Sequence, residues 1–254
     1  MPRPSSAASG YDVALYDEIA EAESRSFWFR ARNRLIVSTV RRHFPYAQSL
    51  LEVGCGTGFV LAALREAFPG MRLVGAELFA EGLEIARRRL PDLEFVELDA
   101  TRMPYEDEFD VVGAFDVLEH IEEDTAALRD MEKALRAGGG VVLLVPQHPR
   151  IWSRMDTVSR HVRRYTRREL TEKVRAAGLE PVEATSFVST LLPAMVASRA
   201  VRRALRLPYD PIAELQPGLL NRPFERILDG ERWLIERGLS LPVGGSLLLV
   251  ARKT

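Results

Sequence analysis

The chain has 254 residues, of which 46% are hydrophobic and 28% charged, an ordinary globular composition that excludes disordered, collagen-like and disulfide-rich classes. Its 35 basic and 36 acidic side chains give a net charge of −1, so no overall field favours nucleic acid or anionic lipid. A single cysteine, Cys55, excludes an intrachain disulfide, and we expect a cytoplasmic protein.

The N-terminal part divides into two pieces. Residues 1–10 are small, polar or proline, which predicts a disordered tail without the apolar run of a secretory signal. Residues 11–48 are predicted to form a helical cap, in which the run from Ser26 to Arg34 leads into a helix before the first strand. No apolar run reaches the roughly 18 residues that span a bilayer, so we expect no transmembrane segment.

The middle of the chain has the rhythm of a parallel sheet. Short apolar runs alternate with helical patterns of about ten residues, which is typical of βαβ units. We predict seven strands, at residues 49–53, 72–76, 93–98, 109–114, 141–145, 179–186 and 246–252. Helices are expected over 124–136, ended by Gly138, Gly139 and Gly140, and over 168–177. The fold class is therefore α/β, with a doubly wound, mostly parallel seven-stranded sheet.

An insertion of helical character precedes the last strand. Residues 191–243 separate two parts of the main domain, 49–190 and 244–254, and begin with a basic amphipathic stretch. We consider, in this order, a cap over a bound substrate, a dimer interface, and peripheral contact with a membrane surface. The oligomeric state, monomer or homodimer, stays open.

The most informative segment joins the first strand to its helix. In the run from Glu52 to Phe59, glycine stands at every second position, and only glycine lets backbone turn this tightly against a ligand. The dinucleotide fingerprint would need glycine where Phe59 stands, and the phosphate-binding loop would need a lysine that this run lacks. A pyrophosphate ligand, and with it an NAD-dependent oxidoreductase, is disfavoured.

With Glu52 before it, this turn resembles the first motif of the class I S-adenosylmethionine-dependent methyltransferases. Further matches follow at the ends of the second, third and fourth strands, where ligands bind in doubly wound sheets. The resemblance covers residues 35–146 and implies S-adenosyl-L-methionine as cofactor. It implies eight cofactor-binding residues: Glu52, Gly54, Gly56, Gly58, Glu77, Asp99, Ala100 and Phe115. Among these, Glu77 would accept the two ribose hydroxyls and Asp99 the adenine amino group. N-terminal helices often cover the cofactor in similar methyltransferases, and Trp28 is a candidate for that cover or for the core.

The family's reaction is an in-line transfer for which the protein holds two reactants roughly 3 Å apart, without an obligatory metal. His120, just after the fourth strand, is the candidate catalytic base, because its ordinary pKa near 6.5 suits that task. The alternative is a helix-start histidine with local hydrogen bonds. Asp116, Glu119 and His120 resemble a cluster that supports a divalent metal in some quinone-biosynthesis O-methyltransferases. The same letters recur in relatives without metal, so we expect no metal site.

The segment after the fifth strand is rich in arginine. Between residues 146 and 168 it carries seven arginines against one acidic residue, Asp156. Arginine binds carboxylate or phosphate with two parallel hydrogen bonds, so we hypothesise an acceptor with an anionic group. The alternative is a solvated arginine face paired with acidic residues elsewhere. The candidate substrate-binding residues are His148, Trp152, Arg163, Arg164 and Tyr165.

We therefore predict an enzyme that transfers methyl groups from S-adenosylmethionine to a small-molecule acceptor, first of all at oxygen. The alternatives are an N-methyltransferase of a small molecule and a non-catalytic S-adenosylmethionine-binding partner subunit. No nucleic-acid partner is expected, because neither a separate RNA-binding module nor a broad basic face is evident.

Overall fold

The computed structural model describes residues 15–206 and 218–254, so the tail predicted at residues 1–10 lies outside the described residues. Within the described residues, no helix is both long enough and apolar enough to cross a bilayer.

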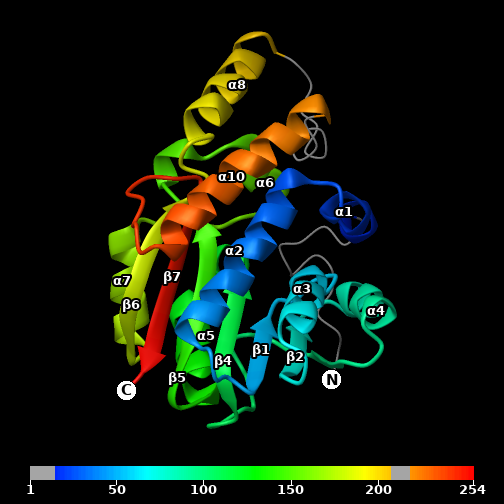
Figure 1. Ribbon diagram of the computed structural model, residues 1–254, viewed down its shortest axis with the longest axis vertical. Coiled ribbons are helices and arrows are strands. Elements are labelled where there is room, and N and C mark those ends of the chain that lie inside the picture. Colours follow the sequence, from blue (N-terminus) through cyan, green and yellow to red (C-terminus); the bar gives the residue numbers. More distant parts are fainter. Residues whose placement is uncertain (1–14, 207–217) are drawn as a thin grey trace.

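Seven strands form one sheet in the order β3-β2-β1-β4-β5-β7-β6 (Figure 1). They are β1 (Ser49–Val53), β2 (Arg72–Glu77), β3 (Glu94–Glu97), β4 (Phe109–Phe115), β5 (Leu135–Pro146), β6 (Leu179–Phe187) and β7 (Ser246–Lys253). The strand β7 runs antiparallel to both neighbours, and the other neighbouring pairs are parallel. The predicted doubly wound, mostly parallel sheet is confirmed.

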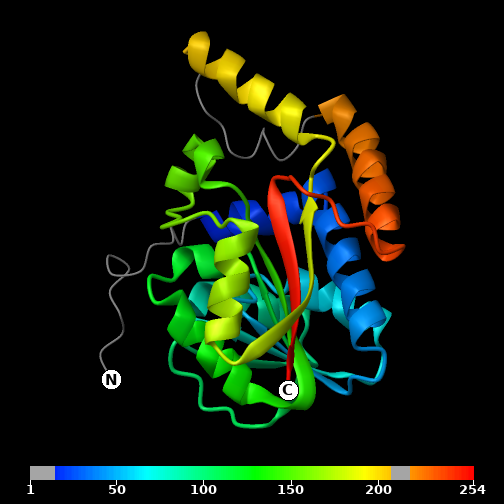
Figure 2. The same ribbon diagram turned by 90° about the vertical axis from the view of Figure 1, so that its left-hand side faces the viewer.

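Helices cover both faces of the sheet (Figures 1 and 2). On one face lie α5 (Asp124–Ala134) and α7 (Arg167–Ala176), and on the other α2 (Phe27–His43), α3 (Phe59–Ala67), α4 (Ala80–Arg89) and α10 (Asn221–Glu236). The remaining helical pieces are α1 (Leu15–Glu23), η1 (Leu118–His120), η2 (Pro149–Ile151), α6 (Arg154–Val158), α8 (Leu192–Ala204) and η3 (Gly218–Leu220). Because side chains alternate along a strand, Leu50 packs into one core and Leu51 into the other.

The glycine triplet plays a different part from the one predicted. The helix α5 ends at Ala134 and β5 begins at Leu135, so Gly138, Gly139 and Gly140 lie inside the strand. A Cβ on Gly139 would lie 2.7 Å from the carbonyl oxygen of Asp110, and one on Gly140 would lie 2.2 Å from that of Ala251. Glycine is required here because neighbouring backbone approaches too closely for a side chain, so these residues do not end the helix.

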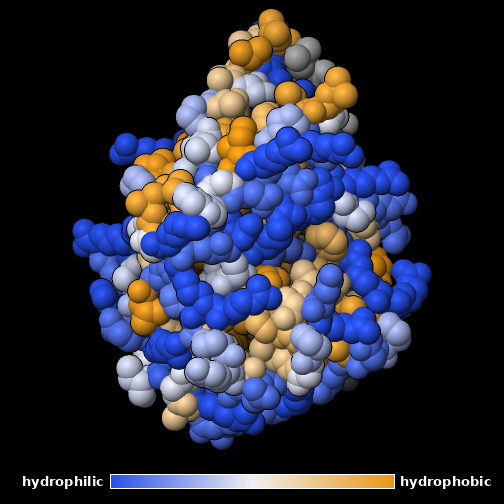
Figure 3. All heavy atoms as spheres, in the orientation of Figure 1, coloured by the Kyte–Doolittle hydropathy of each residue, from blue (hydrophilic) through white to orange (hydrophobic). Residues whose placement is uncertain are grey.

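The insertion is fastened to the N-terminal helix. The rings of Phe27 and Phe224 meet at 5.4 Å, and Arg34 donates to Asp229 at 2.8 Å. Arg30 and Arg34 both pair with Glu225, so charged contacts continue along α2 and α10. The two helices lie side by side in both ribbon views, and a hydrophilic band lies over them in Figure 3. Hydrophobic residues gather instead at the top of that face, over α8.

Candidate functional site

A cavity of about 720 Å³ lies at the carboxyl ends of β1, β4 and β5. Its walls come from separate parts of the chain: the glycine turn after β1, the segment after β4, the region of α6, the helix α2 and the insertion. Side chains from α8 and α10, among them Met195 and Phe224, close one side. Ligands of doubly wound sheets bind at this position.

The glycine turn forms the wall nearest the sheet. Gly54, Gly56 and Gly58 have φ angles of +67°, +52° and +75°, in the left-handed region that favours glycine. A Cβ on Gly54 would lie 2.4 Å from Cγ2 of Val117, whereas on Gly56 the nearest atom would be Cε1 of Tyr16 at 3.9 Å. Gly54 therefore allows tight packing under the turn, and Gly56 leaves open space on the cavity side.

Glu77 braces this turn from the end of β2. Its side chain is buried and accepts hydrogen bonds from the backbone N–H of Gly56 at 2.9 Å and of Leu78 at 2.8 Å. Burial raises the pKa of Glu77, although these hydrogen bonds oppose the rise. Asp99, at the end of β3, is exposed and accepts from the backbone N–H of Thr101 at 2.9 Å. Neither carboxylate lines the cavity.

The predicted cofactor residues thus fall into two groups. Glu52, Gly54, Gly56 and Phe115 line the cavity. Those outside its lining are Gly58, Glu77, Asp99 and Ala100. The cofactor role of all eight stays a prediction.

Two buried ionisable side chains among those that line the cavity each have a polar atom without a hydrogen-bond partner in the described part of the chain. Oε2 of Glu52 and Nε of Arg32 make no hydrogen bond with the described residues. Burial raises the pKa of Glu52 well above its ordinary value, and the nearby Arg32 opposes that rise. Arg32 itself pairs with Asp116 at 2.6 Å. A ligand with both an amino and a carboxyl group, such as the methionine part of S-adenosylmethionine, would satisfy both orphaned atoms, so the residues present fit this cofactor.

His120 lies in the cavity wall at the end of η1, close to a second histidine. The rings of His120 and His161 meet edge to face with centroids 4.8 Å apart. Burial, with a smaller contribution from His161, lowers the pKa of His120 to about 3. The ring is therefore neutral at physiological pH, and its role as a base stays a prediction.

The predicted substrate residues are spread over several environments. Arg164 lines the cavity but is buried against Asp156, with Nε and Oδ1 2.6 Å apart. Arg163 pairs with Asp124 at 2.6 Å, and the hydroxyl of the fully buried Tyr165 donates to the same carboxylate at 2.7 Å. Both lie outside the cavity lining. Arg163 thus pairs with an acidic residue elsewhere in the chain, as in the alternative, whereas Arg164 is buried and its acidic partner belongs to the same segment.

The two other candidates also lie outside the cavity. His148 has a φ of +62° and lies in neither hollow described here. Trp152 is 44% exposed and lines a second hollow beside α8. The substrate role of all five residues stays a prediction.

Sequence reasoning assigned no role to several residues that the fold brings to the site, among them Glu23, Arg32 and Asp156, and it placed His161 only in the substrate wall. Arg32 carried one usable signal, since it is a charged residue within a helix that packs on the core. Asp156 and His161 carried none, because their partners are set by the path of a loop.

The chain matches the model of a methyltransferase domain over residues 51–143. A demethylmenaquinone methyltransferase from Chlorobaculum tepidum is 33% identical over 102 residues, which are 40% of this chain and 42% of that relative. The dTDP-3-amino-3,6-dideoxy-alpha-D-glucopyranose N,N-dimethyltransferase of Streptomyces fradiae is 40% identical over 89 residues, or 35% of this chain and 33% of that one. The chain thus spans less than half the length of these two curated relatives.

A solved structure, the complex between the Haloferax volcanii Trm112 methyltransferase activator and a methyltransferase, matches with a TM-score of 0.64 and 20% identity. The match covers 95% of this chain and 96% of that chain, and at this identity it shows the fold alone. The fold, the glycine turn and the matching domain agree, and S-adenosyl-L-methionine is the cofactor of the family they indicate. The methyltransferase-domain match over residues 51–143, the methyltransferase names of these relatives and the fold are consistent with a class I S-adenosylmethionine-dependent methyltransferase.

Proposed function

We propose that this protein transfers the methyl group of S-adenosylmethionine to a small-molecule acceptor, first of all at an oxygen atom. The observation that carries the proposal is the junction of the glycine turn with a cavity of about 720 Å³ that several buried ionisable groups line. Small-molecule sites are commonly about 300–1,000 Å³ in volume, so this cavity has room for a ligand of that class.

The chain's own residues supply binding, orientation and shelter from water. When bound, the cofactor supplies an electrophilic methyl group on a positively charged sulfur. Arg32 and Glu52 are suited to hold the amino-acid end of the cofactor, because both residues line the cavity and each has a buried polar atom without a hydrogen-bond partner among the described residues. The aromatic ring of Phe224 and the side chain of Met195 cover the other side, which favours exclusion of water during transfer.

An acceptor with an anionic group is the first candidate. Two arginines of α8, Arg199 and Arg202, line the cavity. Arg32 and Arg164 also line it, but these two pair with Asp116 and Asp156. Carboxylate or phosphate groups suit such side chains. An amine acceptor is the second candidate, because four acidic residues line the same cavity: Glu23, Glu52, Asp116 and Glu119. The name of the Streptomyces fradiae relative, an N,N-dimethyltransferase of an amino sugar, also supports the amine.

The test has two arms. Calorimetry with S-adenosylhomocysteine measures cofactor binding, and transfer of a tritiated methyl group is screened over phenols, sugars, carboxylates and amines. We expect Arg32→Met to weaken S-adenosylhomocysteine binding by about tenfold or more, because a hydrogen bond to a charged group contributes about 1.5–3 kcal/mol. The matched control is Arg168→Met, since that side chain is 88% exposed and pairs only with Glu172 among the described residues.

The outcomes separate the candidate functions. Binding with transfer to a hydroxyl or carboxylate supports the first candidate, and transfer only to amines supports the second. Binding without transfer across the whole screen supports a non-catalytic partner subunit. Absence of S-adenosylhomocysteine binding by folded protein would refute the proposal.

A further inference from the structure

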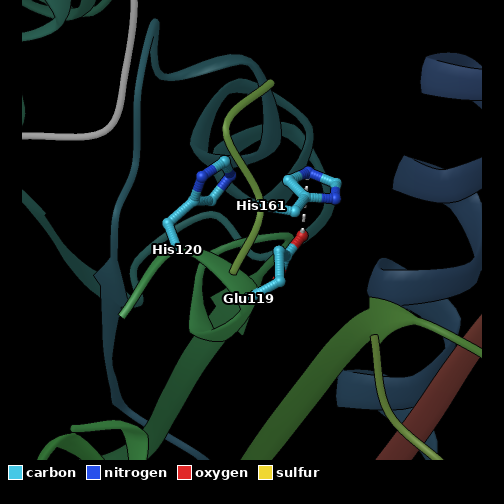
Figure 4. A group of neighbouring side chains, drawn as sticks. All are labelled: Glu119, His120 and His161. Carbon is cyan, nitrogen blue, oxygen red and sulfur yellow. Dashed lines mark ion pairs between the residues drawn. The ribbon is translucent and has the colours of Figure 1, made fainter. Parts of the chain in front are cut away.

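Three side chains of types that commonly bind metal ions lie close together among the residues that line the cavity. Glu119 and His120 belong to η1, directly after β4, and His161 comes from the loop between α6 and α7 (Figure 4). One donor atom from each lies within 4.8 Å of the other two. All three residues are among those that line the cavity.

Glu119 is the strongest sign that something is missing from this group. Its side chain is fully buried, yet neither carboxylate oxygen takes part in a hydrogen bond with the described residues. The nearest ring nitrogen, Nε2 of His161, is 4.0 Å from Oε1, which is too far for a hydrogen bond. A buried carboxylate without partners is costly unless it is paired or coordinates a metal.

His161 is held in the orientation that a metal ligand needs. Its Nδ1 lies 3.0 Å from Oδ1 of Asp156, which leaves Nε2 directed toward Glu119. Asp156 is itself fixed, because it accepts from Arg164 at 2.6 Å and from the backbone N–H of Ser153 at 2.7 Å. A carboxylate on the far nitrogen of a histidine is the usual second layer around a bound metal, where it sets the tautomer and the ring orientation.

We propose that Glu119, His120 and His161 bind a divalent transition-metal ion, of which Zn²⁺, Fe²⁺ and Co²⁺ are suitable examples. Two imidazole nitrogens and one carboxylate oxygen suit these ions, whereas Mg²⁺ and Ca²⁺ prefer oxygen ligands throughout. With bonds of about 2.1 Å, a tetrahedral ion needs donors about 3.4 Å apart, so the 4.0 Å separation of Glu119 and His161 must close by roughly 0.6 Å and the other donor separations, of at most 4.8 Å, by up to roughly 1.4 Å. Rotation of side chains supplies a movement of this size.

This ligand set differs from the acidic-x-x-Glu-His run noted in the sequence. Asp116, the first member of that run, forms an ion pair with Arg32 at 2.6 Å. The third side chain beside Glu119 and His120 is His161. Sequence spacing did not indicate that His161 joins Glu119 and His120. Because the fold brings these three side chains together, we depart from the expectation of no metal site.

The role of the ion rests on the proposed function. With three protein ligands, a bound ion would have a coordination position left for an acceptor, as in catalytic zinc sites. An acceptor hydroxyl bound there would have a lowered pKa and would lose its proton to solvent more readily. The proposal therefore favours acceptors with a hydroxyl or anionic oxygen.

The test is a titration of tag-free, chelator-treated protein with Co²⁺, followed by visible d–d absorption and, with Zn²⁺, by calorimetry. We expect one ion per chain, and at least tenfold weaker Co²⁺ binding in Glu119→Gln and in His161→Ala. The matched control is His43→Gln, a histidine of α2 that pairs with Glu183 away from the cavity. It should bind Co²⁺ as the unaltered protein does.

Three results would overturn the inference: no binding by the unaltered protein at millimolar Co²⁺ and Zn²⁺, unchanged binding in both site variants, or loss of binding in His43→Gln. Circular dichroism checks that each variant is folded, and His161→Gln replaces His161→Ala if the latter is not. Calorimetry with S-adenosylhomocysteine on the same samples keeps the two proposals apart. Cofactor binding without metal binding would refute the metal site alone, and absence of both would refute the proposed function as well.

Discussion

Substituting alanine for Gly54 tests whether packing beneath the glycine turn determines its geometry. The residue has a φ of +67°, and an added Cβ would lie 2.4 Å and 2.8 Å from the two methyl carbons of Val117. A non-glycine residue in the left-handed region costs about 1–2 kcal/mol. Insertion of a methyl group into a well-packed site costs about 1–3 kcal/mol more. Gly54→Ala should therefore lower the free energy of unfolding by about 2–5 kcal/mol.

Gly138→Ala measures the cost of the left-handed backbone conformation alone, without the cost of packing an added methyl group. Gly138 has a φ of +77°, and no atom lies within 4 Å of the position of its added Cβ. It also lies near the start of β5, at the end of the strand away from the cavity. This control should cost about 1–2 kcal/mol and leave S-adenosylhomocysteine affinity unchanged.

Gly56→Ala separates stability from binding in the same turn. Its φ is +52° and its added Cβ would meet only Tyr16, at 3.9 Å, so the loss of stability should resemble that of Gly138→Ala. The methyl group would occupy space at the cavity wall, so affinity for S-adenosylhomocysteine should fall by about tenfold or more. Urea unfolding followed by circular dichroism, with calorimetry, measures both quantities. Equal losses of stability in Gly54→Ala and Gly138→Ala would show that Val117 gives way and would refute the packing argument.

Two further predictions concern buried carboxylates. Glu77→Gln places an amide N–H₂ against one of the backbone N–H donors of Gly56 and Leu78. We expect the free energy of unfolding, measured with urea, to fall by about 1–3 kcal/mol. Calorimetry should show at least fivefold weaker binding of S-adenosylhomocysteine. In Glu183, burial would raise the pKa, but hydrogen bonds from His43 and Arg42 outweigh burial and hold it below its ordinary value of 4.5. Glu183→Gln should therefore lower the free energy of unfolding by about 1–3 kcal/mol at pH 7. This difference from the unaltered protein should disappear as the pH falls through the folded-state pKa of Glu183. A difference that persists or grows in acid would contradict the assignment.

The sheet was predictable because its signals are local. The parallel strands β1, β2 and β4 are short and mostly apolar, and the predicted position of β1 agrees with the structure to the residue. The apolar strand predicted at residues 109–114 lies in the interior of the sheet, since β4 is between β1 and β5. The glycine triplet misled because glycine ends helices and also permits close backbone approach, and only the pairing of Gly140 with Arg252 shows which applies.

The candidate site was predictable only where it is contiguous in sequence. The glycine turn combines strand, turn and helix within ten residues, so its motif can be read directly. The arginine-rich segment shows the opposite case, because its charge was visible but its partners were not. Arg163 and Arg164 are neutralised by Asp124 and Asp156, and Asp156 is a member of the segment itself. Counting charges along a loop therefore overstates the field that a ligand would meet.

The position of Arg32 connects the two halves of the cavity. From α2 it reaches Asp116 at the end of β4, and its charge also acts on Glu52 at the end of β1. The helix α2 is in turn fastened to α10 of the insertion through Arg34 and Asp229. The wall expected to hold the cofactor and the wall expected to face the acceptor are thus parts of one packed unit. Because buried charges are stable only when compensated, this arrangement ties the geometry of the glycine turn to the placement of the insertion.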